Sequence, residues 1–226
     1  MDRLTSWFIA FLLCASVSSV QGTDTLVISN GFDKAVLGKE LSVHYSENSA
    51  IPLDEIKYES FKQLNAPRPN LGFCDGALWV RFYVQNESDE MDFRIHINQP
   101  VLDSISVFVL NEKHEIVNTQ VFGESLRYDH RKYKTPPFVL DQKLPKNSIL
   151  TVYLKIVSDE QIVLPLYVAS IPASEYLMFT PNLLLGAYFG LIVVMILYNL
   201  FIYFTVRDRS YILYVVYIIA VGSTQA

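Results

Sequence analysis

The chain has 226 residues, of which 51% are hydrophobic and 18% are charged. Soluble domains carry about 25% charged residues, and the deficit here lies at the two apolar ends of the chain, while the middle is ordinary. The formal net charge of −5 and the lack of a basic stripe in the sequence argue against a nucleic-acid partner. The composition therefore indicates a soluble domain attached to a membrane.

Residues 1–22 have the three-part pattern of a secretory signal peptide. Arg3 precedes an apolar run from Trp7 to Val17, and small residues lead to Gly22, so we expect cleavage before Thr23. The alternative is a membrane anchor, but the apolar run of about 11 residues is shorter than the roughly 20 that a spanning helix needs. If this segment is removed, Cys74 is the one remaining cysteine, and no intramolecular disulfide can form.

Residues 23–175 are predicted to form an all-β jelly-roll sandwich. Short segments rich in β-branched and aromatic residues, separated by turn formers, are typical of such folds. We expect strands within residues 25–30, 40–46, 77–86, 91–100, 102–110, 115–123, 136–142, 148–157 and 163–170. The period-two alternation within several of them indicates strands with one apolar face.

The outward positions of two predicted strands carry the first candidate ligand-binding residues. Trp79, Arg81 and Tyr83 share one face of 77–86, and Arg94 and His96 share one face of 91–100. If the two strands are adjacent, these side chains form one polar and aromatic surface of the kind that binds sugars. The alternative is a structural role in which the Arg81 guanidinium packs on the Trp79 ring.

The loop "RYDHRKYKTPP", residues 127–137, supplies the second candidate site. Loops carry function more often than the scaffold that holds them. Its hydrogen-bond donors fit an anionic or hydroxyl-rich ligand, and the alternative is a solvated basic connection. The candidate residues here are Arg127, Tyr128, His130, Arg131 and Tyr133, with Lys132 and Lys134 beside them.

Motifs for catalysis are not found in the sequence. It has no glycine-rich phosphate loop, GxSxG or HExxH, and the four histidines lack metal-ligand spacing. We therefore expect neither an enzyme nor a cofactor or metal, although a sandwich glycosidase with two carboxylates stays open. Asn86 begins a glycosylation sequon, "NES", which is a weak signal.

Two membrane helices are predicted at the C-terminal end. The first is expected over residues 182–206, with Pro181 just before it, and its 22 uncharged residues from Leu183 to Phe204 span about 33 Å. Residues 207–210 form a turn, and residues 211–226 begin a second, incomplete span. Arg207 and Arg209 place the turn in the cytoplasm, which agrees with export of residues 23–175. The alternative is a buried helical hairpin of a soluble protein.

The stretch "YFGLIVVMILYNLFIYFTVRDRSYILYVVY" resembles the start of the membrane region of bacterial seven-transmembrane receptors with diverse intracellular signalling modules, 7TMR-DISM. The upstream segments "LWVRFYVQN", "PPFVL" and "ILTVYLKIVS" resemble the type 2 extracellular domain of these receptors. The chain would then be an apparently truncated receptor with at most two of the seven helices.

This resemblance implies a sensor in the bacterial inner membrane. A jelly roll in the periplasm would bind a carbohydrate or related small ligand, and the helices would pass the signal to a cytoplasmic output module such as a diguanylate cyclase or a histidine kinase. The alternatives are a membrane-tethered carbohydrate-binding or adhesion module without signal transmission, and a membrane-anchored sandwich hydrolase.

Overall fold

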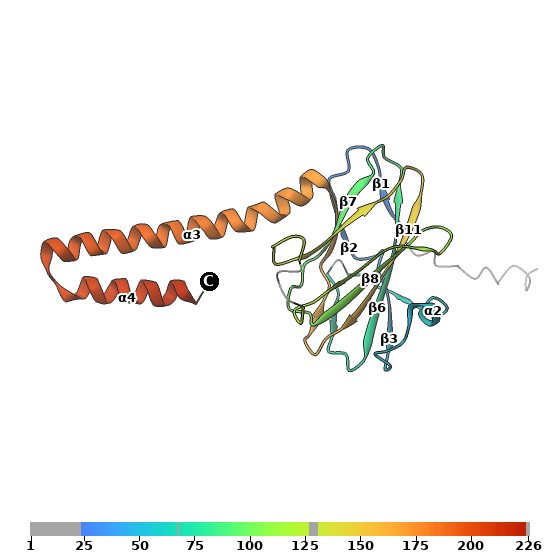
Figure 1. Cartoon of the computed structure of the whole chain (residues 1–226), viewed down its shortest axis with the longest axis horizontal. Coiled ribbons are helices and arrows are strands. Elements are labelled where there is room, and N and C mark those ends of the chain that lie inside the picture. Colours follow the sequence, from blue (N-terminus) through green and yellow to red (C-terminus); the bar gives the residue numbers. More distant parts are fainter. Residues whose placement is uncertain (1–23, 67, 127–130, 225–226) are drawn as a thin grey trace, which may run out of the picture.

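The computed structural model describes residues 24–66, 68–126 and 131–224, and the predicted signal peptide lies outside them. The described chain forms a β-sandwich, from one side of which a helical hairpin extends (Figure 1). The predicted all-β sandwich followed by apolar helices is confirmed.

The sandwich consists of two main sheets. The first sheet has the strand order β4-β3-β6-β11-β8-β9, with β1 paired in parallel to β6. Its strands are β1 Leu26–Ile28, β3 Ser42–Ser46, β4 Lys62–Gln63, β6 Ala77–Asn86, β8 Ser104–Leu110, β9 Ile116–Phe122 and β11 Ile149–Val157. The second sheet has the order β10-β7-β13-β2, with β2 Lys34–Leu37, β7 Asp92–Ile97, β10 Phe138–Lys143 and β13 Leu166–Ser170. A small sheet pairs β5 Asn70–Gly72 with β12 Ile162–Val163.

Alternation along the strands builds the core between the two sheets. The inward residues are buried and form one cluster, which includes Leu78, Val80, Phe82, Val84, Phe93, Ile95, Ile97, Val152 and Leu154. The sequence predicted this apolar face for β6, β7 and β11. The short strands β2, β4, β5 and β12 and the short helix α2 Leu53–Ile56 have too few residues for a periodic pattern and were not predicted, whereas β1 lies within the predicted strand 25–30.

The turn after β6 carries the chain from the first sheet to the second. The Asn86 side chain is fully buried and organises this turn, because its Nδ2 donates to the carbonyls of Glu90 at 2.7 Å and Leu144 at 2.8 Å. Its Oδ1 accepts from the Ser88 amide and hydroxyl. Asn86 therefore serves the fold, and its amide is not accessible to a glycosyl donor in the folded chain.

Helix α3, Ile171–Val206, begins directly after β13 and thus earlier than the predicted start at residue 182. Ser170 precedes the helix, and Pro172 rather than Pro181 lies in its first turn. Pro181 is inside the helix, where its missing N–H leaves the Leu177 carbonyl without its usual partner. The prediction that Pro181 precedes the helix is wrong. Prolines inside helices cause kinks, and α3 bends close to the sandwich (Figure 1).

The charged turn "RDR" is structured to reverse the chain. Arg207 adopts a left-handed conformation with φ of 60°, and its amide donates to the Tyr203 carbonyl at 2.7 Å. Asp208 caps α4, Arg209–Ser223, by accepting a hydrogen bond from the Ser210 amide at 2.8 Å. The turn is therefore residues 207–208 and shorter than the predicted 207–210. Because α4 runs back beside α3 (Figure 1), the predicted antiparallel pair is confirmed.

Within the described residues, α3 is the one helix long and apolar enough to cross a bilayer. Its 36 residues measure about 54 Å, which exceeds the roughly 30 Å hydrocarbon core. Helix α4 is also apolar but has 15 residues. Most of the large apolar side chains of α3 face outward, as expected for contact with lipid and unlike a helix buried in a soluble protein.

Candidate functional site

The two predicted groups of ligand-binding residues on strands lie on opposite sides of the molecule. Trp79, Arg81 and Tyr83 are on the outer face of the first sheet, while Arg94 and His96 are on the outer face of the second. The prediction of one shared surface is wrong, because the strands β6 and β7 are consecutive in sequence but not adjacent in a sheet.

Trp79 is fully buried even though it is on an outward position. The segment that contains α2 covers it, through Leu53 and Ile56, and Phe108 stacks on its ring at 6.0 Å between centroids. A ligand cannot reach the indole without displacing this cover. Trp79 is therefore placed as a core residue of a second, smaller apolar cluster.

Arg81 packs against aromatic rings of the same outer face. Its guanidinium lies 4.2 Å from the centroid of Phe61 and 5.6 Å from that of Tyr83. This arrangement corresponds to the structural alternative, with Phe61 in place of Trp79 as the partner ring. Tyr83 is half-buried, and burial raises the pKa of its hydroxyl.

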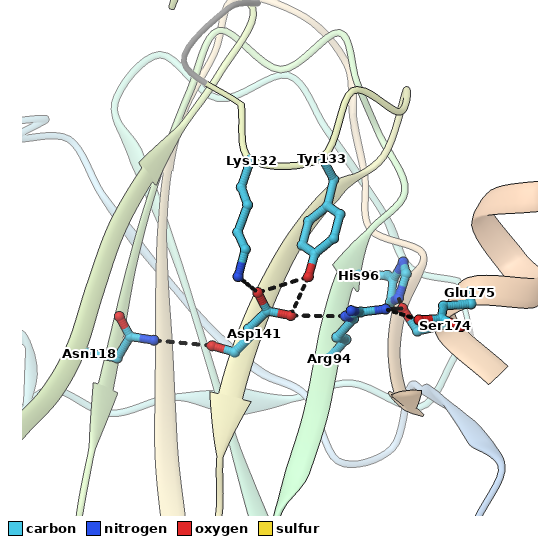
Figure 2. Close-up of polar contacts among 8 residues, drawn as sticks. All are labelled: Arg94, His96, Asn118, Lys132, Tyr133, Asp141, Ser174 and Glu175. Atoms are coloured by element: carbon cyan, nitrogen blue, oxygen red, sulfur yellow. Dashed lines mark hydrogen bonds and ion pairs between the residues drawn. The ribbon is translucent and has the colours of Figure 1, made fainter. Parts of the chain in front are cut away.

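The described part of the predicted loop site lies next to Arg94 on the second sheet, not next to Trp79 on the first. Arg127, Tyr128 and His130 lie outside the described residues. The Arg131 guanidinium packs over the Phe138 ring at 4.5 Å, and Lys132 and Tyr133 point toward the second sheet (Figure 2).

Asp141 on β10 is the centre of a polar cluster (Figure 2). The Tyr133 hydroxyl lies 2.7 Å from its Oδ1 and 2.9 Å from its Oδ2, and Lys132 Nζ donates to Oδ2. Arg94 Nε donates to Oδ1 at 2.9 Å. The strand register explains the last contact, because Asp141 pairs directly with Arg94 across β10 and β7.

Arg94 also reaches helix α3. Its Nη1 donates to Ser174 Oγ at 3.3 Å and lies 3.9 Å from Glu175 Oε1. His96 Nε2 makes a second contact with Ser174 Oγ, at 2.8 Å. Since Ser174 is fully buried, the first turns of α3 are held to the sheet by Arg94 and His96 (Figure 2).

A cavity of about 600 Å³ opens beside this cluster, where the edge strands β9 and β10 meet. We call it the Asp141 pocket. Arg94, Lys132, Tyr133 and Asp141 line it together with Asp92, Phe93, Val117, Asn118, Gln142, Lys143 and Ile171. Asn118 of β9 donates to the Asp141 carbonyl at 3.3 Å and to Gln142 Oε1 at 3.1 Å, which fixes the edge of the pocket.

Electrostatics keep Asp141 ionised. Burial would raise its pKa, but hydrogen bonds from Lys132, Tyr133 and Arg94 outweigh burial and lower it. The pKa of Lys132 is raised by the same hydrogen bond, so both partners are charged at neutral pH. His96 is different, because burial and the nearby Arg94 charge lower its pKa to about 4, and it is therefore neutral.

Sequence reasoning missed Asp141, Asn118 and Ser174 as members of this site. Asp141 directly follows the apolar run "PPFVL", and an acidic residue at an outward position of such a strand is the one signal that the sequence offers. Its partner strand, and the return of α3 to the sheet, depend on the tertiary fold. Among the described residues, no group of three or more His, Cys, Asp or Glu side chains is arranged to hold a metal ion.

Family comparison identifies both parts of the chain. Residues 38–170 match the model of the 7TMR-DISM extracellular 2 domain, which spans more than half of the chain. Residues 181–226 match the model of the 7TM diverse intracellular signalling region. The chain belongs to the 7TMR-DISM family. This is a family of membrane receptors with an extracellular domain. The first matched region corresponds to the sandwich, and the second contains α3 from Pro181 onward together with α4.

Among solved structures, the 7TMR-DISM chain is similar to carbohydrate-binding modules at low identity. A family 35 module from Clostridium thermocellum is 12% identical, with a TM-score of 0.32, and the match covers 60% of this chain and 96% of that one. A family 35 module from an environmental isolate is 11% identical, with a TM-score of 0.27, covering 46% and 77%. Scores this low carry no argument about the ligand. No curated protein matches the chain.

Proposed function

We propose that this chain is the sensory part of a bacterial membrane receptor, in which the Asp141 pocket binds a carbohydrate or related hydroxyl-rich ligand and Arg94 couples the pocket to helix α3. The observation that carries this proposal is the double role of Arg94. It donates to Asp141 in the pocket and to Ser174 in the helix.

The pocket chemistry favours hydroxyl groups as ligands. An ionised carboxylate accepts hydrogen bonds only, and the Asp141 oxygens, which accept from Lys132, Tyr133 and Arg94, would each take one hydroxyl of a vicinal pair in place of one of these bonds. Lys132, Arg94 and Asn118 supply donors around it, while the Tyr133 ring and Val117 offer apolar surface. A small number of polar groups in a partly apolar cavity is the usual arrangement for binding an oriented small ligand.

The route to the membrane is short. Ser170 ends β13 and immediately precedes α3, so no flexible linker separates the second sheet from the helix. A ligand that forms hydrogen bonds to Asp141 would compete with Arg94 for this carboxylate. It would thereby change the hydrogen bond between Arg94 and Ser174. Signalling requires different affinities of the ligand for the two arrangements of this contact.

We propose binding rather than catalysis for the same pocket. A general acid in a glycosidase needs a raised pKa, whereas the hydrogen bonds to Asp141 lower it. The pocket also contains a second carboxylate, Asp92, and its substitution tests whether the pocket hydrolyses glycans. Loss of a glycan-hydrolysing activity in Asp92→Asn would favour the hydrolase.

The proposed location is the bacterial inner membrane with the sandwich in the periplasm. Three features support it: the predicted signal peptide of residues 1–22, the cationic turn at Arg207 and Arg209, and the family match. A cytoplasmic diguanylate cyclase or histidine kinase in the full-length receptor is the proposed output.

Binding of the full chain, in detergent micelles, to a panel of immobilised glycans tests the ligand proposal. Asp141→Asn and Tyr133→Phe should each reduce the signal of any bound glycan by about tenfold, since each removes hydrogen bonds to a charged group worth about 1.5 kcal/mol. Asp54→Asn is the matched control, because Asp54 is 89% exposed, forms an ion pair with Lys57 and lies far from the pocket in sequence and fold.

Equal losses in Asp141→Asn and Asp54→Asn would contradict a site at Asp141. Binding that persists without any effect on α3 would instead favour the membrane-tethered binding or adhesion module. The two outcomes are separable, because the first is read from glycan binding and the second from the helix.

A further inference from the structure

A second cavity, of about 470 Å³, lies between the second sheet and helix α3. Val36 of β2 and Tyr167 of β13 form its floor, since both are on outward positions of that sheet. Leu177, Met178 and Pro181 of α3 form one wall. We call this cavity the junction pocket. It is separate from the Asp141 pocket, and the two share no lining residue.

The charge of the junction pocket is one-sided. Lys34 and Arg68 line it, and no described lining residue is acidic. Both side chains are exposed, and Arg68 Nη2 makes a long contact of 3.5 Å with the Tyr167 hydroxyl. His96 also lines the pocket, but it is neutral because its pKa is lowered to about 4. Two cations without a carboxylate favour an anionic ligand.

The position of the pocket along α3 favours a membrane lipid as the source of the anion. The uncharged residues of α3 end at Val206, and about 22 residues cross a hydrocarbon core of roughly 30 Å. The outer boundary of the core then lies near Leu185. Pro181 is about 6 Å above that boundary, within the headgroup layer of about 5–8 Å, and Leu177 is about 12 Å above the boundary, just outside this layer.

The apolar wall of the pocket, formed by residues of α3, continues along the helix toward the region that we place in the hydrocarbon core. Leu177 and Met178 lead along α3 toward Leu184 and Leu185, which are exposed on the helix. A ligand with a negative head and an apolar tail would place its head at Lys34 and Arg68, and its tail along α3. A free anion would use the two cations alone and leave the apolar wall without a partner.

We propose that the junction pocket binds the headgroup and proximal acyl carbons of an anionic phospholipid from the outer leaflet of the membrane. The phosphate contacts Lys34 and Arg68, and the lipid fills the space between the sheet and the bent part of α3. The lipid thereby supports the angle at which α3 leaves the sandwich. The residues that line this site are different from those of the Asp141 pocket, so the lipid can bind whether or not that pocket holds a glycan.

The test uses the full chain in dodecyl maltoside micelles, titrated with dioleoyl phosphatidylglycerol and followed by native mass spectrometry. We expect phosphatidylglycerol to form a one-to-one adduct with the chain, and we expect phosphatidylcholine at the same concentration to form less of it. Lys34→Gln and Arg68→Gln should each weaken retention by roughly fivefold, and the double variant by roughly 25-fold, because each cation near an anionic lipid contributes a similar increment. Lys113→Gln, on the exposed turn between β8 and β9, removes the same charge and should leave retention unchanged.

A variant of the apolar wall tests the lipid part separately. Met178→Glu places a negative charge in the pocket without removing a cation, and it should abolish the adduct while the far-ultraviolet circular dichroism spectrum stays that of the parent. Equal retention of the two lipids, or equal losses in Lys34→Gln and Lys113→Gln, would overturn the proposal. Displacement of the lipid by an equal concentration of inorganic phosphate would also overturn it, because the tail would then contribute nothing.

Discussion

Arg94 should transmit changes at Asp141 to the first turns of helix α3, and a double-mutant cycle can measure this. The cycle combines Asp141→Asn, which removes the charge in the pocket, with Ser174→Ala, which removes the acceptor on the helix. The two side chains each bond to Arg94. The same cycle is repeated with Arg94→Lys, which keeps the charge but loses the planar fork that serves both partners.

The magnitude follows from the contacts. The bond from Arg94 Nε to Asp141 at 2.9 Å involves two charges, but Asp141 is 33% exposed, so it contributes about 1.5 kcal/mol, at the lower end for such bonds. The bond to Ser174 at 3.3 Å contributes about 1 kcal/mol. Since coupling cannot exceed the weaker contact, we expect an interaction energy of about 0.5–1 kcal/mol.

Amide hydrogen exchange of the full chain in lipid nanodiscs provides the measurement. The amides of Ser174 to Met178 are the first in α3 with intrahelical partners, so their opening free energy reports the hold of the sheet on the helix. Asp141→Asn should accelerate their exchange, although Asp141 is not in the helix. Additivity within about 0.3 kcal/mol in the parent background, or an unchanged interaction energy with Arg94→Lys, would refute the role of Arg94.

Four further predictions concern stability, ligand access and topology. His96 has a pKa of about 4 in the folded chain, below its value of about 6.5 in the unfolded chain. The unfolded state therefore takes up a proton first, and the contribution of His96 to stability is complete above about pH 6.5 and is lost as the pH falls toward 4. Urea unfolding should show that the free energy of unfolding falls by about 2 kcal/mol between pH 7 and pH 5, and His96→Gln should remove this pH-dependent loss. Asn86→Ala should destabilise the sandwich by roughly 2–4 kcal/mol in the same assay, because two carbonyls and the Ser88 amide lose their partner. Trp79→Phe should cost about 1–3 kcal/mol of stability through the cavity it leaves yet keep glycan binding, and selective loss of binding in a stable variant would return Trp79 to the ligand site. Arg207→Glu with Arg209→Glu should reduce the fraction of chains with the turn in the cytoplasm, as measured by cysteine labelling at residue 210 from either side of the membrane. Lys39→Glu with Lys113→Glu, at two exposed positions outside both pockets, is the charge-matched control.

Local patterns predicted the strands but not their neighbours. The alternation in "LWVRFYVQN" determines which side chains of β6 face the core, because one apolar face must be buried. It does not determine which strand lies beside β6. Here β1, β3 and β11 pair with it, whereas β7, the next strand along the chain, joins the other sheet. The predicted surface of Trp79 with Arg94 failed at this step.

For the loop, composition indicated the chemistry of the candidate residues but not their position, and their role in ligand binding stays a prediction. Lys132 and Tyr133 do enter a polar cavity together with Arg94, but their shared partner Asp141 is eight to nine residues further along the chain, in a different element. Likewise, the uncharged run of α3 indicated a membrane span, while its start at Ile171 was hidden because residues 171–182 contain polar residues and Pro181. Among the polar residues, Ser174 contacts Arg94 and His96 of the second sheet.

The arrangement of the two pockets suggests why α3 begins within the sandwich. His96 bonds to Ser174 and also lines the junction pocket, where Leu177 and Met178 follow one turn later on the helix. The Asp141 pocket reaches the same Ser174 through Arg94. A ligand in either pocket would therefore act on the same two turns of α3, which precede Pro181 in the helix. If both proposals hold, bound lipid should change the affinity for the glycan by some factor. By linkage, bound glycan should then change the affinity for the lipid by the same factor. Titration of a bound glycan in micelles with and without phosphatidylglycerol measures this factor, and a factor of one would mean that the two pockets act on α3 independently.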